Sequence, residues 1–260
     1  MMTNSAILKL PTHSFFNREV CFPKWEQELT IFCDFDGPIV DVSDRYYSTY
    51  KLGLMRTISY YKEQGKKLIP KQLSKAQFWQ MKQDRIDDVE ITKISGLQGQ
   101  QIDFFLEQVQ KIVNHPMLLE QDKIQPGVNW ALGMLHLKGV QLVLVTLRST
   151  SQVENILEKQ NIKHLFSGIY GRKDCESAYQ NKAALKTELL KKASTDFGDR
   201  TSAYTIGDTE ADILAAKKLG IPAIALTCGI RSYKYLKQFQ PDYFYANLLS
   251  SVRHLLKQKV

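Results

Sequence analysis

The stretch that decides the fold is Leu29-Thr30-Ile31-Phe32-Cys33-Asp34-Phe35-Asp36-Gly37. A short apolar and β-branched run of this kind is typical of a strand that is buried on both faces. The two aspartates after it stand two residues apart, so their carboxylates project to the same side if the chain stays extended. We therefore predict a buried strand at 29–33 that leads into a polar site.

Further strands and helices alternate along the rest of the chain. Short apolar or aromatic runs predict strands at 140–145, 203–206, 223–226 and 243–245. Amphipathic segments predict helices at 128–138, 150–160, 181–193, 209–219 and 247–257. A strand–helix–strand order that repeats from residue 124 onward is typical of an α/β fold with a doubly wound, parallel, Rossmann-like sheet.

Residues 43–124 follow a different pattern, because aromatic and aliphatic residues such as Tyr46, Tyr50 and Leu54 recur there at helical spacing. The segments 73–94 and 99–115 also favour helices, and no convincing strand is found between them. We predict three parts: an N-terminal extension at 1–28, an α/β core at 29–42 and 125–260, and a mostly helical insert at 43–124.

Composition excludes several classes of protein. The chain has 260 residues, of which 43% are hydrophobic and 24% charged, and this is typical of a globular protein. No run approaches the roughly 18 apolar residues of a membrane span, and residues 1–28 lack the apolar core of a signal peptide. Four widely spaced cysteines without a C-x-x-C pattern favour a reduced, cytoplasmic location. The net charge of +8 is spread along the chain, so it selects no nucleic-acid or membrane partner.

Polar residues follow the other predicted strands. Thr146 ends the run at 140–145, a lysine stands at the start of the helix at 181–193, and Asp208 and Asp212 follow the run at 203–206. Each has a structural explanation, such as a turn or a helix N-cap. Ligands of open α/β sheets bind at the carboxyl ends of the strands, however, and carboxylate oxygens suit Mg²⁺. The shared order therefore indicates a site for a phosphoryl group and a metal ion.

These motifs resemble the four signatures of the haloacid dehalogenase superfamily of phosphohydrolases. They are Asp34-Phe35-Asp36-Gly37, Leu144-Val145-Thr146, a lysine, and Gly207-Asp208-x-x-x-Asp212. The resemblance covers essentially residues 29–260. The helical insert resembles the helical cap of the phosphoglycolate phosphatase-like branch of that superfamily.

The resemblance implies a role for each motif residue. Asp34 would attack phosphorus and form an aspartyl-phosphate, while Asp36 would protonate the leaving group and then activate water. Mg²⁺ would lie between the Asp34 carboxylate, the Asp36 carbonyl and the Asp208 side chain. Thr146 and the lysine would hold phosphoryl oxygens, and Asp212 would orient the lysine or a metal-bound water. Phosphoryl transfer depends chiefly on such positioning and charge neutralisation.

Three lysines are candidates for the phosphate-binding position: Lys173, Lys182 and Lys186. Lys173 comes too early in the chain, in a glycine-flanked loop. Lys182 opens the helix, and a helix N-terminus attracts anions. Its interval to Asp208 also resembles the usual interval of the family. We therefore predict that Lys182 completes the site.

The remaining substrate contacts are predicted from position alone. Gly37 and Arg148 adjoin the motif residues, and Gly37 permits a tight turn close to an anion. Trp79, Lys82 and Arg85 share one broad helical face in the insert and could reach the far end of a substrate.

The prediction is a cytoplasmic, Mg²⁺-dependent phosphatase for a small phosphorylated metabolite, either a phosphoglycolate-like or a sugar phosphate monoester. We expect a monomer or homodimer without a nucleic-acid or membrane partner. Two alternatives stay open: a phosphomutase of the same branch and a non-catalytic sensor of a phosphorylated ligand. Pro38 slightly favours the sensor, because it stands where the family usually has threonine and removes an N–H and a hydroxyl from the loop.

Overall fold

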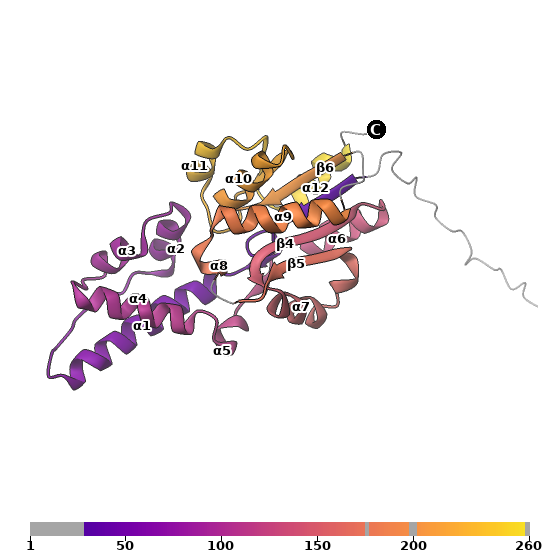
Figure 1. Ribbon diagram of the computed structural model, residues 1–260. Helices are drawn as coiled ribbons and strands as arrows, with labels where there is room; N and C mark the ends of the chain where they lie inside the picture. Colours follow the sequence, from indigo (N-terminus) through magenta and orange to yellow (C-terminus); the bar gives the residue numbers. More distant parts are fainter. Residues whose placement is uncertain (1–28, 175–176, 198–201, 258–260) are drawn as a thin grey trace, which may run out of the picture.

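The structure is a computed structural model that describes residues 29–174, 177–197 and 202–257. The predicted N-terminal extension therefore lies outside the described residues. The described part consists of a sheet with helices on both faces and a group of helices that stands to one side of it (Figure 1). No helix in these three ranges is long and apolar enough to cross a membrane.

A six-stranded sheet forms the core, in the order β5-β4-β1-β6-β7-β8. Every neighbouring pair in it is parallel, which confirms the prediction of a doubly wound α/β fold. The strands are β1 (Leu29–Cys33), β4 (Gln141–Ser149), β5 (Gly168–Arg172), β6 (Ser202–Gly207), β7 (Ala223–Leu226) and β8 (Tyr243–Tyr245). Five of these strands lie close to predicted positions, whereas β5 was not predicted.

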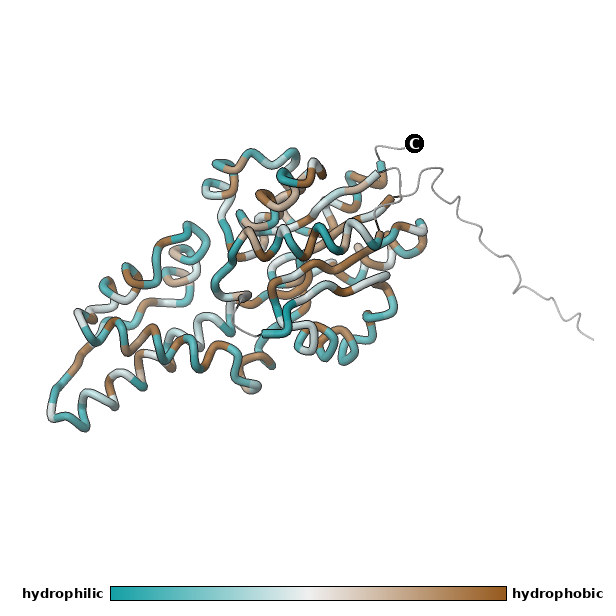
Figure 2. Tube along the Cα trace, viewed as in Figure 1, coloured by the Kyte–Doolittle hydropathy of each residue, from teal (hydrophilic) through white to brown (hydrophobic). Residues whose placement is uncertain are grey.

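Side chains of the central strands alternate between two apolar layers. Ile31 of β1 and Leu142 of β4 face a layer with α6 (Val128–Leu137), α7 (Thr150–Lys159) and α12 (Leu248–Lys257). Phe32 and Val143 face the opposite layer, with α9 (Ala183–Phe197) and α10 (Glu210–Lys218). Burial on both faces explains the continuous apolar runs in the sequence, and Figure 2 shows hydrophobic residues along these strands.

The helical insert contains five helices in the structure. They are α1 (Ser43–Glu63), α2 (Lys75–Gln83), α3 (Asp88–Ile94), α4 (Gln100–Ile112) and α5 (Pro116–Leu119). Tyr50 of α1 stacks on Phe78 of α2 with ring centroids 4.9 Å apart, and it packs edge-on against Phe105 of α4. The two connections to the sheet pair with each other through the short strands β2 (Val40–Asp41) and β3 (Lys123–Ile124).

Two details of the insert differ from the prediction: β3 (Lys123–Ile124) is a strand where none was expected, and one predicted helix is interrupted. The segment 73–94 is broken between α2 and α3, because Arg85 has a positive φ of 60° and Asp87 begins a new helix. The Asp87 side chain accepts a hydrogen bond from the backbone N–H of Val89, as an N-cap residue does. Four short helical segments complete the described chain: α8 (Ser177–Gln180), α11 (Tyr233–Leu236), η1 (Lys163–Leu165) and η2 (Lys237–Phe239).

Candidate active site

Three neighbouring strands bring the predicted site residues to one edge of the sheet. Asp34 directly follows β1, and its backbone N–H donates to the carbonyl of Ile206 in β6 over 2.8 Å. Asp208 directly follows β6, so the two aspartates leave the sheet next to each other. Thr146 lies inside β4 rather than at its end, because this strand continues to Ser149. Thr146 lines the same cavity as Asp34.

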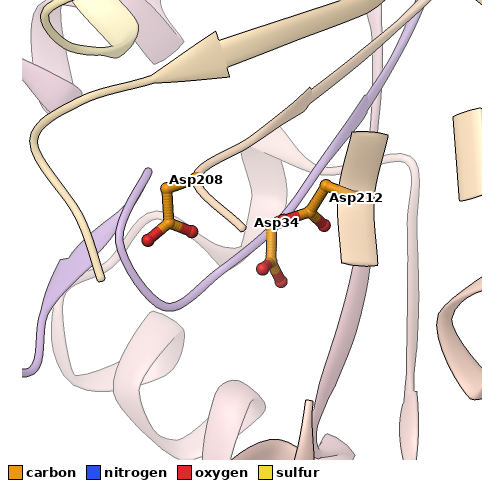
Figure 3. Close-up of side chains that lie close together, drawn as sticks. All are labelled: Asp34, Asp208 and Asp212. Atoms are coloured by element: carbon orange, nitrogen blue, oxygen red, sulfur yellow. The ribbon is translucent and has the colours of Figure 1, made fainter. Parts of the chain in front are cut away.

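Three buried carboxylates converge at this edge. Each of Asp34, Asp208 and Asp212 offers an oxygen, and these oxygens lie within 4.8 Å of one another. Figure 3 shows Asp34 between the other two side chains. Burial raises the pKa of Asp208 well above its usual value, and the charges of Asp34 and Asp212 raise it further. Three carboxylates this close together favour a cation between them.

Asp208 fits a narrow space that only glycines allow. A Cβ atom at Gly37 or at Gly229 would overlap with the Asp208 carboxylate, and Gly37 also has a positive φ of 93°. One oxygen, Oδ2, accepts a hydrogen bond of 2.5 Å from the backbone N–H of Ile230. The other, Oδ1, is buried and has no hydrogen-bond partner among the described residues. An orphaned buried carboxylate oxygen is costly, and a metal ion would satisfy it.

The lysine of the site is Lys186, so the prediction of Lys182 is wrong. The Lys186 Nζ atom lies 2.8 Å from Asp34 Oδ1 and 2.6 Å from Asp212 Oδ1, and its side chain is 3% exposed. Lys182 is exposed and precedes the first residue of α9. Helical side chains lean toward the helix N-terminus, so a lysine one turn inside α9 covers the site at its end.

Burial and neighbouring charges have opposite effects on the pKa values of Asp34 and Lys186. Burial raises the pKa of Asp34 to about 7, although the Lys186 ammonium opposes the rise. Burial alone would lower the pKa of Lys186, but the Asp212 and Asp34 carboxylates outweigh burial and raise it. Lys186 therefore stays charged at neutral pH. It also fixes one Asp34 oxygen, which accepts a second hydrogen bond from the Phe35 N–H.

Asp212 positions Lys186 and also caps a helix. Its Oδ2 accepts hydrogen bonds from the backbone N–H and the hydroxyl of Thr209, the N-cap residue of α10. Its Oδ1 contacts Lys186. The predicted role of Asp212, to orient the lysine or a metal-bound water, stays a prediction, and this ion pair is compatible with its first alternative. The capping residue is Thr209, and Asp208 faces the other carboxylates instead.

The second aspartate of the D-x-D-G motif is held by two arginines. Arg148 and Arg45 each form an ion pair with Asp36, over 2.8 Å and 3.3 Å. Burial would raise the pKa of Asp36, but the two guanidinium groups outweigh it and hold the pKa below its usual value. The structure thus directs Arg148 toward Asp36, whereas the sequence predicted a substrate contact. Arg45 was missed altogether.

Residues of the helical insert close the cavity above the aspartates. Lys82 lies there with its Nζ 2.7 Å from Asp88 Oδ1, and the other Asp88 oxygen accepts the hydroxyl of Tyr179. Burial lowers the pKa of Lys82, while Asp88 partly offsets the shift. Trp79 does not line this cavity but packs edge-on against Tyr46, which does.

The rim of the cavity joins the helical insert to the core. Arg85 of the insert and Arg231 of the core both contact Glu210, at 3.2 Å and 2.9 Å. Arg231 also donates to the backbone carbonyl of Lys82 over 3.2 Å. Lys82 and Arg85 therefore both line the cavity, and the substrate contact expected of them stays a prediction. Their partners were missed: Glu210 is 125 residues from Arg85 and Arg231 is 149 residues from Lys82, while Asp88 is near in sequence but begins a separate helix.

The arrangement combines the parts that phosphoryl transfer requires. The Asp34 carboxylate lies beside the Lys186 ammonium and within a group of carboxylates that could hold a metal ion. Thr146 and Asn181 line the same cavity and add polar groups. Positive charge next to a nucleophile can neutralise the oxygens of a phosphoryl group as it is transferred.

Comparisons with known proteins agree with this geometry. The pattern of the haloacid dehalogenase-like hydrolases matches residues 31–226. A phosphoglycolate phosphatase of Salmonella typhi is 35% identical over 120 residues, which are 46% of each chain. One of Escherichia coli (strain K12) is 34% identical over 123 residues, 47% of each chain. The chain thus spans about half the length of the curated relatives it matches.

Solved structures show the same fold. A haloacid dehalogenase-like family hydrolase of Streptococcus pneumoniae superimposes with a TM-score of 0.58 at 23% identity. The match covers 88% of this chain and 98% of that one. Because the family pattern covers most of the chain and the four motifs meet at one edge of the sheet, this chain belongs to the haloacid dehalogenase-like hydrolase family.

Proposed function

We propose that the protein is a Mg²⁺-dependent phosphatase that hydrolyses a small phosphorylated metabolite through an aspartyl-phosphate on Asp34. The contact that carries the proposal is the 2.8 Å ion pair of Asp34 with Lys186, beside the carboxylates of Asp208 and Asp212. The names of the curated relatives support the reaction class. We further propose that it acts in the cytoplasm as a monomer or homodimer, without a nucleic-acid or membrane partner.

The first step transfers the phosphoryl group to the protein. An oxygen of Asp34 attacks phosphorus, the ester bond breaks, and the leaving oxygen takes a proton from Asp36. Lys186 and the hydroxyl of Thr146 hold the phosphoryl oxygens and neutralise the charge that develops on them. In the second step Asp36 takes a proton from water, which attacks phosphorus and frees Asp34. The pKa of Asp36 is held below its usual value, so this carboxylate is ionised and able to accept the proton in the second step, and the proton that it gives in the first step must enter with the substrate.

The residues present fit a magnesium ion. Asp34 and Asp208 would hold it, with Asp212 close by, because these hard oxygen ligands converge and Asp208 Oδ1 is otherwise unsatisfied. When bound, the ion would offset negative charge on the nucleophile and on the phosphoryl group.

Lys82 and Arg85 are proposed to contact the part of the substrate that leaves, because both line the cavity next to the aspartates. Trp79 is proposed to act indirectly, by supporting the Tyr46 wall of the cavity. The cations at this wall are paired with Asp88 and Glu210. These ion pairs do not select between a phosphoglycolate-like substrate and a sugar phosphate, so the proposal includes both.

A panel of phosphate esters tests the proposed function. We expect the protein to hydrolyse p-nitrophenyl phosphate and at least one alkyl phosphate among phosphoglycolate, glycerol phosphate and glucose phosphates. Phosphate release should require Mg²⁺ and stop in EDTA. Full activity after metal removal would contradict the metal requirement, and no turnover of any ester with Mg²⁺ would contradict the phosphatase.

Magnesium should stabilise the fold more strongly at higher pH. Folding raises the pKa of Asp34 from 3.8 to about 7 and also raises that of Asp208. A raised carboxyl pKa means that metal-free stability is highest at low pH and falls as pH rises through the folded-state pKa. Mg²⁺ binds the ionised carboxylates and so opposes this loss.

The measurement is thermal unfolding with and without saturating Mg²⁺. We expect the metal to raise Tm by about 5 °C or more at pH 7.5 and by clearly less at pH 5.5, from roughly 3 kcal/mol of binding energy. An equal shift at both pH values would show that the metal does not depend on these carboxylates. The Asp208→Asn variant provides the matched control and should lose most of the shift.

A further inference from the structure

Both oxygens of the Asp36 carboxylate are held by cations that come from different parts of the chain. Arg148 Nη1 lies 2.8 Å from Oδ1, and Arg45 Nη2 lies 3.3 Å from Oδ2. Arg148 belongs to β4 in the sheet, whereas Arg45 lies in the first turn of α1, at the start of the helical insert. The orientation of Asp36 therefore depends on both the core and the insert.

A second carboxylate closes these contacts into a ring. Asp122 Oδ1 lies 2.8 Å from Arg45 Nε, and Asp122 Oδ2 lies 2.7 Å from Arg148 Nη2. We name Asp36, Arg45, Asp122 and Arg148 the four-residue clamp. Its side chains are 8%, 3%, 0% and 2% exposed. Each buried guanidinium group contacts both carboxylates, and such planar contacts fix the orientation of the carboxylates in addition to neutralising their charge.

The clamp connects the two ends of the helical insert. Arg45 follows the first connection, which contains β2, and Asp122 directly precedes β3 in the second connection. These connections pair with each other in antiparallel register, Asp41 opposite Lys123. A movement of the insert against the core would have to pass through these connections. It would then shift Arg45 and Asp122 relative to Arg148.

We propose that Arg45 and Asp122 are positioning residues that orient Asp36 through the clamp, so that proton transfer by Asp36 depends on the arrangement of the two connections. The inference rests on the proposed function, because it concerns the proton that Asp36 gives to the leaving group. Proton transfer requires donor and acceptor atoms within about 2.6–3.2 Å, so a rotated carboxylate loses it. Asp122 touches neither the cavity nor the other site carboxylates, and it acts through the arginines.

Variants of the clamp should change the dependence on the leaving group. Asp122→Asn keeps the shape but removes the charge that holds the two guanidinium groups together. Arg45→Lys keeps the charge but cannot bridge Asp36 and Asp122 at once. We expect both to lower kcat/KM for an alkyl phosphate by at least about 10-fold. On p-nitrophenyl phosphate, whose leaving group needs little protonation, both should stay within about 3-fold of the wild type.

The neighbouring residues Asp44, directly before Arg45, and Lys123, directly after Asp122, provide a matched control. Asp44 and Lys123 form an exposed ion pair of 2.8 Å between the same two segments, and it does not touch Asp36. Lys123→Met removes this pair and should leave the ratio of the two substrates unchanged. If Lys123→Met shifts the ratio as much as Asp122→Asn, the effect belongs to the connections in general and the clamp proposal is overturned.

The remaining outcomes are also decisive. An equal loss on both substrates in the clamp variants would show a merely structural role and overturn the proposal. Thermal unfolding checks that each variant is folded, and Arg45→Lys carries the test if Asp122→Asn does not fold. If the wild-type protein cleaves neither ester, the proposed function itself is refuted. The wild-type assay alone shows this, so it is distinguishable from a failure of the clamp proposal.

Discussion

Replacing Asp34 with asparagine is expected to lower kcat/KM for every phosphate ester by at least about 10⁴-fold, a loss of about 5.4 kcal/mol in transition-state stabilisation. An amide is a poor nucleophile, so no covalent phosphoryl group should form on residue 34. Lys186 Nζ and the Phe35 N–H hold one oxygen of Asp34 and so fix the orientation of its carboxylate.

Rapid quenching with a labelled phosphate ester measures the covalent intermediate directly. The wild-type protein should retain acid-stable label, and Asp34→Asn should retain none. Asp36→Asn is the matched control two residues away, since it should still be labelled by p-nitrophenyl phosphate. Label on the Asp34→Asn protein would place the nucleophile elsewhere and contradict the proposed mechanism.

Most of the sheet could be predicted because its strands are buried on both faces. Such strands read as continuous apolar runs, as β1 and β7 do. β5 was missed for two reasons. Its sequence, Gly168-Ile169-Tyr170-Gly171-Arg172, contains two glycines, and the strand lies at the edge of the sheet, where it is only partly buried. Its weak pattern leaves too little signal in a single sequence.

The carboxylates could be predicted for a topological reason. Once parallel strands are assigned, the residues at their carboxyl ends must meet at one edge, which places Asp34 beside Asp208 without any knowledge of side chains. Arg45 and Asp122 could not be found in this way, because they meet only when the two connections pair. One signal was present: Arg45 stands next to Tyr46 and one turn before Thr49, on the buried face of α1. A charged residue on a buried helix face requires a partner.

Lys182 was chosen over Lys186 because the direction in which helical side chains lean was not considered. They are four residues apart in sequence, and the attraction of a helix N-terminus for anions favoured the earlier residue. The structure starts α9 at Ala183, so Lys182 stands outside the helix and is exposed. A lysine in the first turn leans back toward the N-terminus and reaches Asp34 from there.

The Lys186→Met variant is therefore expected to lower kcat/KM by about 10³-fold, or about 4 kcal/mol, because it removes the fixed cation beside Asp34 and Asp212. Lys182→Met, four residues earlier and exposed just before α9, should stay within about 3-fold of the wild type and serves as the matched control. Steady-state kinetics of both variants with p-nitrophenyl phosphate make the comparison, and thermal unfolding confirms that Lys186→Met is folded. Methionine is chosen because it preserves the shape of the lysine side chain but not its charge. A larger loss in Lys182→Met than in Lys186→Met would contradict the assignment of Lys186 and favour Lys182 as the phosphate-binding residue.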